Sequence, residues 1–148
     1  MIHKTAIIDP KAKIASNVQI GPYCVIGPHV EIDEKTIIYS HVNISVSAKI
    51  GKENKIYPFV SINDPQDLKY NGEPTNLIIG DNNKIREYVT INPGTAGGGG
   101  KTVIGNNVEI GGGSGVIKDI PDNTKVMGYP AKKIRDFLRE NKWYTKLQ

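Results

Sequence analysis

The sequence predicts an all-β fold: a parallel β-helix of hexapeptide repeats with five to six coils, followed by a short C-terminal α-helix. Three observations predict it: isoleucine at every sixth position over most of the chain, a small or β-branched residue four positions later, and few large aromatic residues. A period of six fits neither a helix of 3.6 residues per turn nor a flat strand. It is the period of a β-helix in which each hexad is one short strand and one turn.

Composition supports a single β-rich domain. The 148 residues include 22 isoleucines but only two phenylalanines and one tryptophan, and isoleucine favours strands. With 38% hydrophobic and 23% charged residues, we expect a soluble protein without a membrane-spanning segment. The single cysteine, Cys24, excludes an internal disulfide framework; we expect it to pack in the core of a cytoplasmic protein.

The isoleucines that anchor the repeat form three runs in the same phase. They are Ile2, Ile8, Ile14, Ile20, Ile26, Ile32, Ile38, Ile44, Ile50, Ile56 and Ile62, then Ile79, Ile85 and Ile91, then Ile104, Ile110 and Val116. Three hexads close one triangular coil, so these anchors give a prism roughly 25–28 Å long at ~4.8 Å per coil. We expect the anchors to point inward and to stack in register.

The fourth residue after an anchor is usually small or β-branched, as the corner of a narrow coil requires. These residues are Ala6, Ala12, Val18, Cys24, Val30, Thr36, Val42, Ala48, Val60, Val89, Thr95, Val108 and Ser114, with Asn54 and Asn83 as polar exceptions. Glycine often follows the anchor directly, where it relieves the backbone at a turn.

Two insertions interrupt the repeat and predict loops at 63–78 and 93–103. The first contains Gln66, Asp67 and Lys69, which place an amide, a carboxylate and an ammonium within four residues. The second is rich in glycine but lacks the Lys-Ser/Thr ending of a phosphate-binding P-loop. Because loops on a rigid scaffold often carry binding residues, we expect the first loop to form the ligand site.

The period stops after Val116, so we expect the β-helix to occupy residues 1–120 and a turn with a basic helix to occupy 121–148. Ala131, Ile134, Phe137, Leu138 and Tyr144 indicate an amphipathic helix. The basic residues of this segment are Lys132, Lys133, Arg135, Arg139, Lys142 and Lys146.

The whole net charge of +4 lies in this segment, because residues 1–130 carry 13 basic and 13 acidic residues. A nucleic-acid-binding protein more often has a basic stripe along its body, so we expect none as a partner. The segment is either a solvated helix or a docking surface for an acidic partner. No cysteine or histidine grouping has the spacing of a metal site or a catalytic triad, so we expect no metal.

Three segments of the chain carry a family resemblance. They are residues 67–75 (Asp-Leu-Lys-Tyr-Asn-Gly-Glu-Pro-Thr), 79–87 (Ile-Gly-Asp-Asn-Asn-Lys-Ile-Arg-Glu) and 97–100 (four glycines). Over about residues 1–107 the chain resembles the UDP-N-acetylglucosamine O-acyltransferases of lipid A biosynthesis. From about Val108, residues 112–123 and 126–131 are similar to the end of the UDP-3-O-acylglucosamine N-acyltransferases. The chain therefore resembles the front of one acyltransferase joined to the tail of another.

This resemblance implies left-handed coils and a homotrimer with sites between neighbouring prisms. It implies transfer of a 3-hydroxyacyl chain from acyl carrier protein to the 3-hydroxyl of a UDP-amino sugar, with no cofactor beyond the phosphopantetheine of the donor. Three tyrosines next to the anchors, namely Tyr39, Tyr57 and Tyr88, also indicate partly apolar faces that a neighbour covers.

The resemblance also implies roles for individual residues. Gln66 contacts the acyl hydroxyl, Asp67 the sugar and Lys69 the phosphopantetheine end, with Tyr70 in the same substrate-binding loop. The secondary candidates are Arg86, Glu87 and Asn92. The carrier-protein docking residues are Lys132, Lys133, Arg135 and Arg139, because acyl carrier protein is strongly acidic.

The histidine base of this family is missing. The family carries it on an Asn-Ala-His-Ile-Ala-His-like stretch after the glycine-rich loop, and Asn92 stands where the family often has another histidine. We expect His29 and His41 to be structural. Asp67 or Glu87 could act as the base only with a strongly raised pKa. The catalytic residue is therefore unknown.

Three functions remain open at this point. The first is an acyltransferase of the lipid A type with reduced or lost activity. The second is a non-catalytic trimeric module that binds a nucleotide sugar or acyl carrier protein, and the third is an acetyl-CoA-dependent sugar transferase. The loop of residues 66–70 favours the first over the third, and the missing histidine favours the second over the first.

Overall fold

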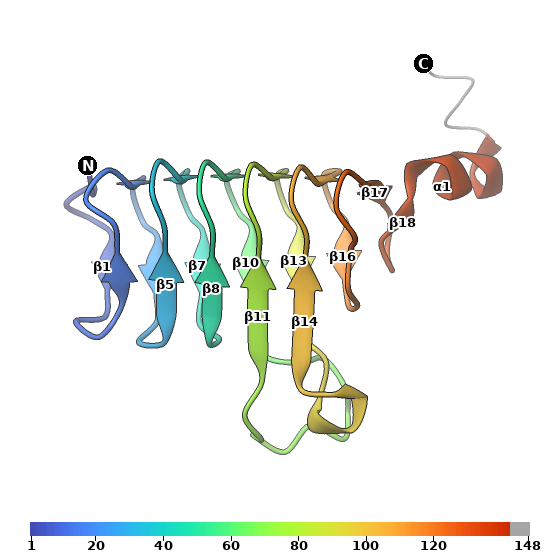
Figure 1. Cartoon of the computed structure of the whole chain (residues 1–148), viewed down its shortest axis with the longest axis horizontal. Coiled ribbons are helices and arrows are strands. Elements are labelled where there is room, and N and C mark those ends of the chain that lie inside the picture. Colours follow the sequence, from blue (N-terminus) through green and yellow to red (C-terminus); the bar gives the residue numbers. More distant parts are fainter. Residues whose placement is uncertain (143–148) are drawn as a thin grey trace.

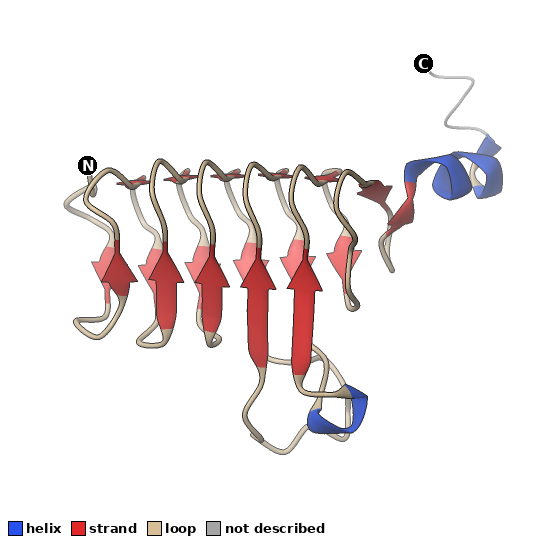
Figure 2. Ribbon diagram, in the orientation of Figure 1, coloured by secondary structure: helices blue, strands red, loops and turns tan. Residues whose placement is uncertain are grey.

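The computed structural model describes residues 1–142 and consists of a triangular prism with a short helix at one end (Figure 1). Each coil contributes one short strand to each of three sheets, which form the prism's sides (Figure 2). One sheet contains β1 (Ile7–Ile8), β4 (Val25–Ile26), β7 (Asn43–Ile44), β10 (Ser61–Ile62), β13 (Thr90–Ile91) and β16 (Gly115–Val116).

The other two sheets complete the triangle. The second contains β2 (Lys13–Ile14), β5 (Val30–Ile32), β8 (Ala48–Ile50), β11 (Asn76–Ile79) and β14 (Lys101–Ile104). The third contains β3 (Gln19–Ile20), β6 (Ile37–Ile38), β9 (Lys55–Ile56), β12 (Lys84–Ile85), β15 (Glu109–Ile110), β17 (Lys125–Met127) and β18 (Lys132–Lys133). All neighbouring strands are parallel except β17 and β18, which confirms the predicted parallel β-helix.

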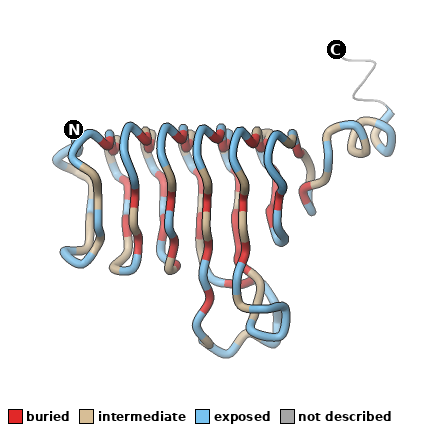
Figure 3. Tube along the Cα trace, viewed as in Figure 1, coloured by how far each residue is buried: buried red, intermediate tan, exposed pale blue. Residues whose placement is uncertain are grey.

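The predicted anchors form the core of the prism (Figure 3). Ile44, Ile62 and Ile91 are fully buried and lie opposite one another on successive rungs of one sheet. At the N-terminal end the burial is incomplete, and Ile2 is 47% exposed. Cys24 is also fully buried, in agreement with its expected place in the core.

The polar exceptions form a hydrogen-bonded column along one corner. The side chain of Asn54 donates to the Gly80 carbonyl at 2.8 Å and accepts from the backbone N–H of Asn83 at 2.9 Å. Asn83 repeats this pattern one coil further, donating to the Gly105 carbonyl at 2.9 Å and accepting from the Val108 N–H at 2.7 Å. These asparagines thus satisfy backbone groups that an apolar side chain would leave unpaired inside the prism.

The insertions are shorter than predicted because two strands begin earlier. β11 and β14 start at Asn76 and Lys101, so the loops occupy residues 63–75 and 92–100. Thr95 was expected at an inward corner, but it lies in the second loop. Leu77 and Thr102 take the inward positions instead, in register with Ala48.

The C-terminal segment differs from the prediction in two ways. The prism continues past residue 120, because β17 pairs with β15. The helix α1 spans Ile134–Glu140 and does not begin at Ala131, whose N–H donates to the Gly115 carbonyl at 2.7 Å. Lys132 and Lys133 therefore lie on β18, while Tyr144 and Lys146 lie outside the described residues. Within residues 1–142, no helix has the length and apolar character needed to cross a bilayer.

Candidate functional site

The two insertions protrude side by side from one corner of the prism (Figure 1). They lie on consecutive coils, so the stacking that pairs β10 with β13 also brings the loops together. The Asn76 N–H donates to the Gly100 carbonyl at 2.9 Å, and the Asn92 side chain donates to the Asp64 carbonyl at 2.7 Å. The second loop contains the short 3₁₀ helix η1 (Ala96–Gly98).

A cleft of about 750 Å³ lies between these loops and the end of the prism. The residues that line it are Gln66, Asp67, Lys69, Glu73, Asn92, Pro93, Gly94, Thr95, Gly97, Gly98, Ile117 and Tyr129. The structure thus brings together three predicted substrate-binding residues, Gln66, Asp67 and Lys69, with the secondary candidate Asn92. The cleft is in the size range of small-molecule sites.

Turns in the first loop orient its polar side chains. The carboxylate of Asp67 accepts a hydrogen bond from the Lys69 N–H at 2.9 Å, an Asx turn that fixes the backbone between them. Glu73 accepts from the Asn71 N–H at 2.8 Å, and such backbone hydrogen bonds lower the pKa of Glu73. Tyr70 is not among the lining residues; desolvation and the carboxylates of Asp64 and Glu73 raise its pKa.

Asn92 forms part of the buried wall of the cleft. Its side chain is tied to the first loop through the Asp64 carbonyl, and the residue is 7% exposed. Among the described residues, its Oδ1 has no hydrogen-bond partner. Asn92 and Ile117 directly follow the paired residues Ile91 and Val116, so they lie on neighbouring rungs.

Tyr129 is a cleft residue that the sequence reasoning missed. Its hydroxyl donates to Oε1 of Gln66, which is 63 residues earlier in the chain. Its ring packs against Gly115, where an added Cβ would lie 2.2 Å from two ring carbons. In the sequence, Tyr129 stands out only as part of the segment 126–131 that resembles the N-acyltransferases.

Arg86 and Glu87 lie at a different corner of the prism and do not line the cleft. Arg86 Nε donates to Glu87 Oε1 at 2.9 Å, and the guanidinium lies 4.3 Å from the centre of the Tyr57 ring. The hydrogen bond from Arg86 lowers the pKa of Glu87. A carboxylate base at neutral pH needs the opposite shift, so Glu87 does not suit that role.

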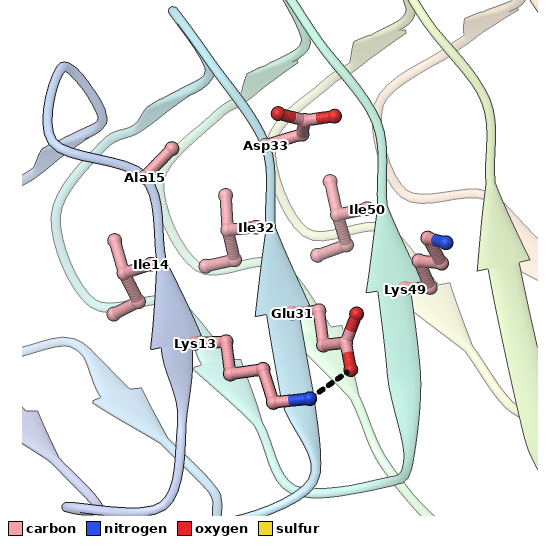
Figure 4. Close-up of a pocket in the computed structure, with 8 residues that line it drawn as sticks. All are labelled: Lys13, Ile14, Ala15, Glu31, Ile32, Asp33, Lys49 and Ile50. Carbon is pink, nitrogen blue, oxygen red and sulfur yellow. Dashed lines mark hydrogen bonds and ion pairs between the residues drawn. The ribbon is translucent and has the colours of Figure 1, made fainter.

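The other hollows found on the described part of the prism are smaller, at about 300–420 Å³. The groove of about 420 Å³ in Figure 4 lies on the sheet of β2, β5 and β8. Lys13 pairs there with Glu31 at 3.1 Å, but these side chains are 77% and 45% exposed. Exposed ion pairs of this kind contribute little to stability and are typical of a solvated face. We therefore take the cleft between the loops as the candidate site.

Comparisons with known proteins identify the family of the chain. A family model described as the bacterial transferase hexapeptide (six repeats) matches residues 1–34 and 11–46. The acyl-[acyl-carrier-protein]–UDP-N-acetylglucosamine O-acyltransferase of Thermodesulfovibrio yellowstonii is 53% identical over 107 residues, which cover 72% of this chain and 42% of that protein. The same enzyme of Saccharophagus degradans gives the same identity and coverage.

Solved structures extend the likeness over nearly the whole chain. The UDP-N-acetylglucosamine O-acyltransferase of Moraxella catarrhalis RH4 aligns with a TM-score of 0.68 and 34% identity, over 95% of this chain and 77% of that chain. The corresponding structure from Acinetobacter baumannii aligns with a TM-score of 0.68 and 32% identity, over 96% and 78% of the two chains. This chain belongs to the UDP-N-acetylglucosamine O-acyltransferase family.

Membership confirms the family resemblance of the sequence and the left-handed parallel β-helix that it implied. The match to these two curated relatives covers 42% of their length, so the chain spans less than half of each. The similarity of the C-terminal end to the N-acyltransferases stays a prediction.

None of the three histidines of this chain lines the cleft. His3 Nδ1 lies 2.9 Å from the Thr5 hydroxyl, and His29 borders a groove on another face. The ring of His41 stacks on Phe59 with centroids 4.9 Å apart. Within residues 1–142, no three histidine, cysteine or acidic side chains come together as a metal site requires.

The predicted docking residues divide into two groups. Lys132 forms an ion pair with Glu140, and Arg139 lies 3.3 Å from Asp136, so these charges are balanced locally. Lys133 and Arg135 are exposed and form no ion pair within the described part of the chain. The positive charge available to a partner is therefore concentrated on two of the four predicted residues.

Proposed function

We propose that this chain binds a UDP-amino sugar and a 3-hydroxyacyl chain carried by acyl carrier protein, as an acyltransferase of the lipid A type. The observation that carries the proposal is the cleft, which gathers Gln66, Asp67 and Lys69 in a chain of this family. An ammonium beside glycine-rich backbone suits a phosphate-bearing ligand, and the carboxylate and amide suit sugar and acyl hydroxyls. The single cysteine, which cannot form an internal disulfide, fits a cytoplasmic setting.

In this proposal the three residues have the roles that the family resemblance implies. Gln66 binds the acyl hydroxyl, Asp67 accepts from the sugar, and Lys69 binds the phosphopantetheine end of the donor. The reaction moves the acyl group from the thioester sulfur to the sugar 3-hydroxyl, whose proton passes to a base while the thiol leaves. No residue of the cleft has been assigned as that base.

The proposal includes a homotrimer, which an exposed aromatic column supports. Tyr23, His41, Phe59 and Tyr88 stack along one corner, with ring centroids 4.9–5.1 Å apart. Three of them are 46–64% exposed, an apolar strip that a second copy could cover. Glu87 precedes Tyr88 on this corner, so a neighbour packed there would also contact the pair of Arg86 and Glu87.

A monomer near 16.2 kDa in light scattering at micromolar concentration would contradict the trimer.

The docking of acyl carrier protein on Lys133 and Arg135 rests on charge complementarity, since these exposed cations can attract an acidic partner over ~8–10 Å at physiological salt.

A second candidate function is a non-catalytic module with the same ligands. The specific observation in its favour is that no histidine lines the cleft and that the pKa of Glu87 is lowered. Such a module would bind both substrates without transferring the acyl group.

One set of measurements separates these functions. Calorimetry measures binding of UDP-N-acetylglucosamine and 3-hydroxyacyl carrier protein, and a turnover assay measures ester formation with donors of several chain lengths. Binding with turnover supports the enzyme, binding without turnover supports the module, and no binding refutes both. Lys69→Ala should weaken donor binding without changing the melting temperature. Lys49→Ala, an exposed lysine on the face in Figure 4, is the matched control.

A further inference from the structure

The buried Oδ1 of Asn92 is the starting point for a more specific inference about the cleft. Asn92 is 7% exposed and lines the cleft, yet this oxygen has no hydrogen-bond partner among the described residues. A buried acceptor without a partner destabilises a folded chain, so native structures rarely retain one without a reason. A ligand that donates a hydrogen bond at this point would remove the penalty.

The orientation of the Asn92 amide is fixed by the first loop. Its Nδ2 donates to the Asp64 carbonyl at 2.7 Å. Rotating the amide by half a turn would place Oδ1 against that carbonyl and set two acceptors face to face, which the hydrogen-bond network excludes. The atom without a partner is therefore the oxygen, and it belongs to a side chain that lines the cleft.

Gln66 is a second amide side chain that lines the same cleft, and it offers a donor where Asn92 offers an acceptor. The Tyr129 hydroxyl donates to Oε1 of Gln66, which leaves Nε2 of Gln66 as the donor that this side chain offers to a ligand. Gln66 is exposed, whereas Asn92 is buried, so the donor lies nearer the solvent than the acceptor.

This arrangement matches a secondary amide, which has one N–H and one carbonyl on separate atoms. A hydroxyl can also donate to Asn92, so the comparison of UDP-N-acetylglucosamine with UDP-glucose separates these two kinds of donor. An anion is disfavoured, because a phosphate or carboxylate oxygen would face the Asn92 Oδ1 without a proton between them. Lys69 is the residue for the anionic part of the ligand.

We propose that Asn92 Oδ1 accepts a hydrogen bond from an amide N–H of the ligand, and that this contact distinguishes amide-bearing ligands from analogues that lack the N–H. The inference rests on the proposed function, in which both substrates carry such a group. The acetamido group of the sugar is one source, and the amides of phosphopantetheine are the other.

The experiment measures binding of three probes to the full chain by calorimetry: UDP-N-acetylglucosamine, UDP-glucose and 4′-phosphopantetheine. UDP-glucose has a hydroxyl where the first probe has the acetamido group. The test variant is Asn92→Leu, which keeps a similar volume and removes both polar atoms. Asn92→Ala repeats the measurement with a smaller side chain in case leucine lowers the melting temperature.

The chain supplies a matched control one rung away. Asn63 directly follows Ile62, which pairs with Ile91, so Asn63 occupies the position equivalent to Asn92 on the preceding coil. Both ends of its amide are bonded within the chain, to Ser45 and Ser61, and it does not line the cleft. Asn63→Leu should therefore change stability without changing how the three probes are distinguished.

We expect the parent to bind at least one amide-bearing probe and Asn92→Leu to bind that probe about tenfold more weakly, the effect of roughly one lost hydrogen bond. A loss for UDP-N-acetylglucosamine but not for UDP-glucose supports the inference with the sugar as the source. A loss for phosphopantetheine alone supports it with the donor as the source. Asn63→Leu should bind like the parent.

Two results would overturn the inference while leaving the proposed function intact. One is that both Asn92 variants bind all three probes as tightly as the parent does, which would mean that Oδ1 takes no part in ligand binding. The other is that they weaken UDP-N-acetylglucosamine and UDP-glucose equally. If the parent binds none of the probes, the proposed function fails and the inference fails with it.

Discussion

The asparagine column inside the prism predicts a large effect for one conservative change, Asn83→Val. Valine already occupies the equivalent corner positions Val60, Val89 and Val108, so its shape suits the site. It has nearly the volume of asparagine, which limits any cavity. The change therefore removes hydrogen bonds and little else.

The magnitude follows from the groups that lose a partner. Asn83 is fully buried, and its side chain binds the Gly105 carbonyl at 2.9 Å and the Val108 N–H at 2.7 Å. Leaving a buried donor or acceptor unpaired costs about 1–3 kcal/mol for each group. Two such groups give an expected loss of about 2–6 kcal/mol in the free energy of unfolding.

Denaturant unfolding measures this loss, at one fixed protein concentration because the stability of an oligomer depends on concentration. Asn43→Val is the control: it makes the same chemical change at an exposed position of β7, where we expect less than about 0.5 kcal/mol. If the two variants differ from the parent by equal amounts, the column does not stabilise the prism and the argument is wrong.

Three further predictions concern the site and its charges. Gly115→Ala should displace the Tyr129 ring, because the new Cβ would lie 2.2 Å from ring carbons, and should weaken ligand binding in calorimetry. Replacing Lys133 and Arg135 by glutamate should abolish binding of acyl carrier protein, and the parent's binding should weaken steeply as salt rises. Glu87 has a lowered pKa in the folded chain, so the unfolded state takes up its proton first as the pH falls. The ionised Glu87 therefore stabilises the folded chain above the ordinary glutamate pKa, and this stabilisation is lost as the pH falls through the lowered pKa of the folded chain. Glu87→Gln should remove that part of the pH dependence of the melting temperature.

Matched controls accompany these predictions. Gly112→Ala adds a methyl group whose nearest contact is 3.4 Å, so it should leave binding unchanged. Glutamate at Lys49 and Lys55, two exposed positions on the sheets, makes the same charge change away from α1. If that control weakens carrier-protein binding as much as the change at Lys133 and Arg135 does, these two residues do not form the docking surface.

The fold could be predicted from the period because a β-helix is almost one-dimensional. Each coil contacts only its neighbours, so a repeat in the sequence is also a repeat in space. The one misplaced corner residue, Thr95, followed from counting forward from Ile91 into an insertion. Counting backward from the next anchor, Ile104, identifies Thr102 as the inward residue.

The cleft was predicted in part for a related reason. Gln66, Asp67 and Lys69 stood out because they form a polar cluster in an insertion, which is a local signal. Tyr129 was missed because its contact with Gln66 spans 63 residues and depends on how many coils separate the two. The start of α1 was misplaced because the tertiary hydrogen bond of Ala131 overrides its preference for a helix.

The number of coils therefore decides the shape of the site as much as the identity of its residues does. Ile104, Ile110 and Val116 keep the interval of six, so the C-terminal segment stacks in phase directly on the coil that carries the second loop. One more coil between β13 and β16 would carry Tyr129 about 4.8 Å further from Gln66. That displacement exceeds the tolerance of a hydrogen bond, whose donor and acceptor must lie within ~3.2 Å. The contact between Gln66 and Tyr129 can form only in a prism in which the tail follows the glycine-rich loop without an intervening coil.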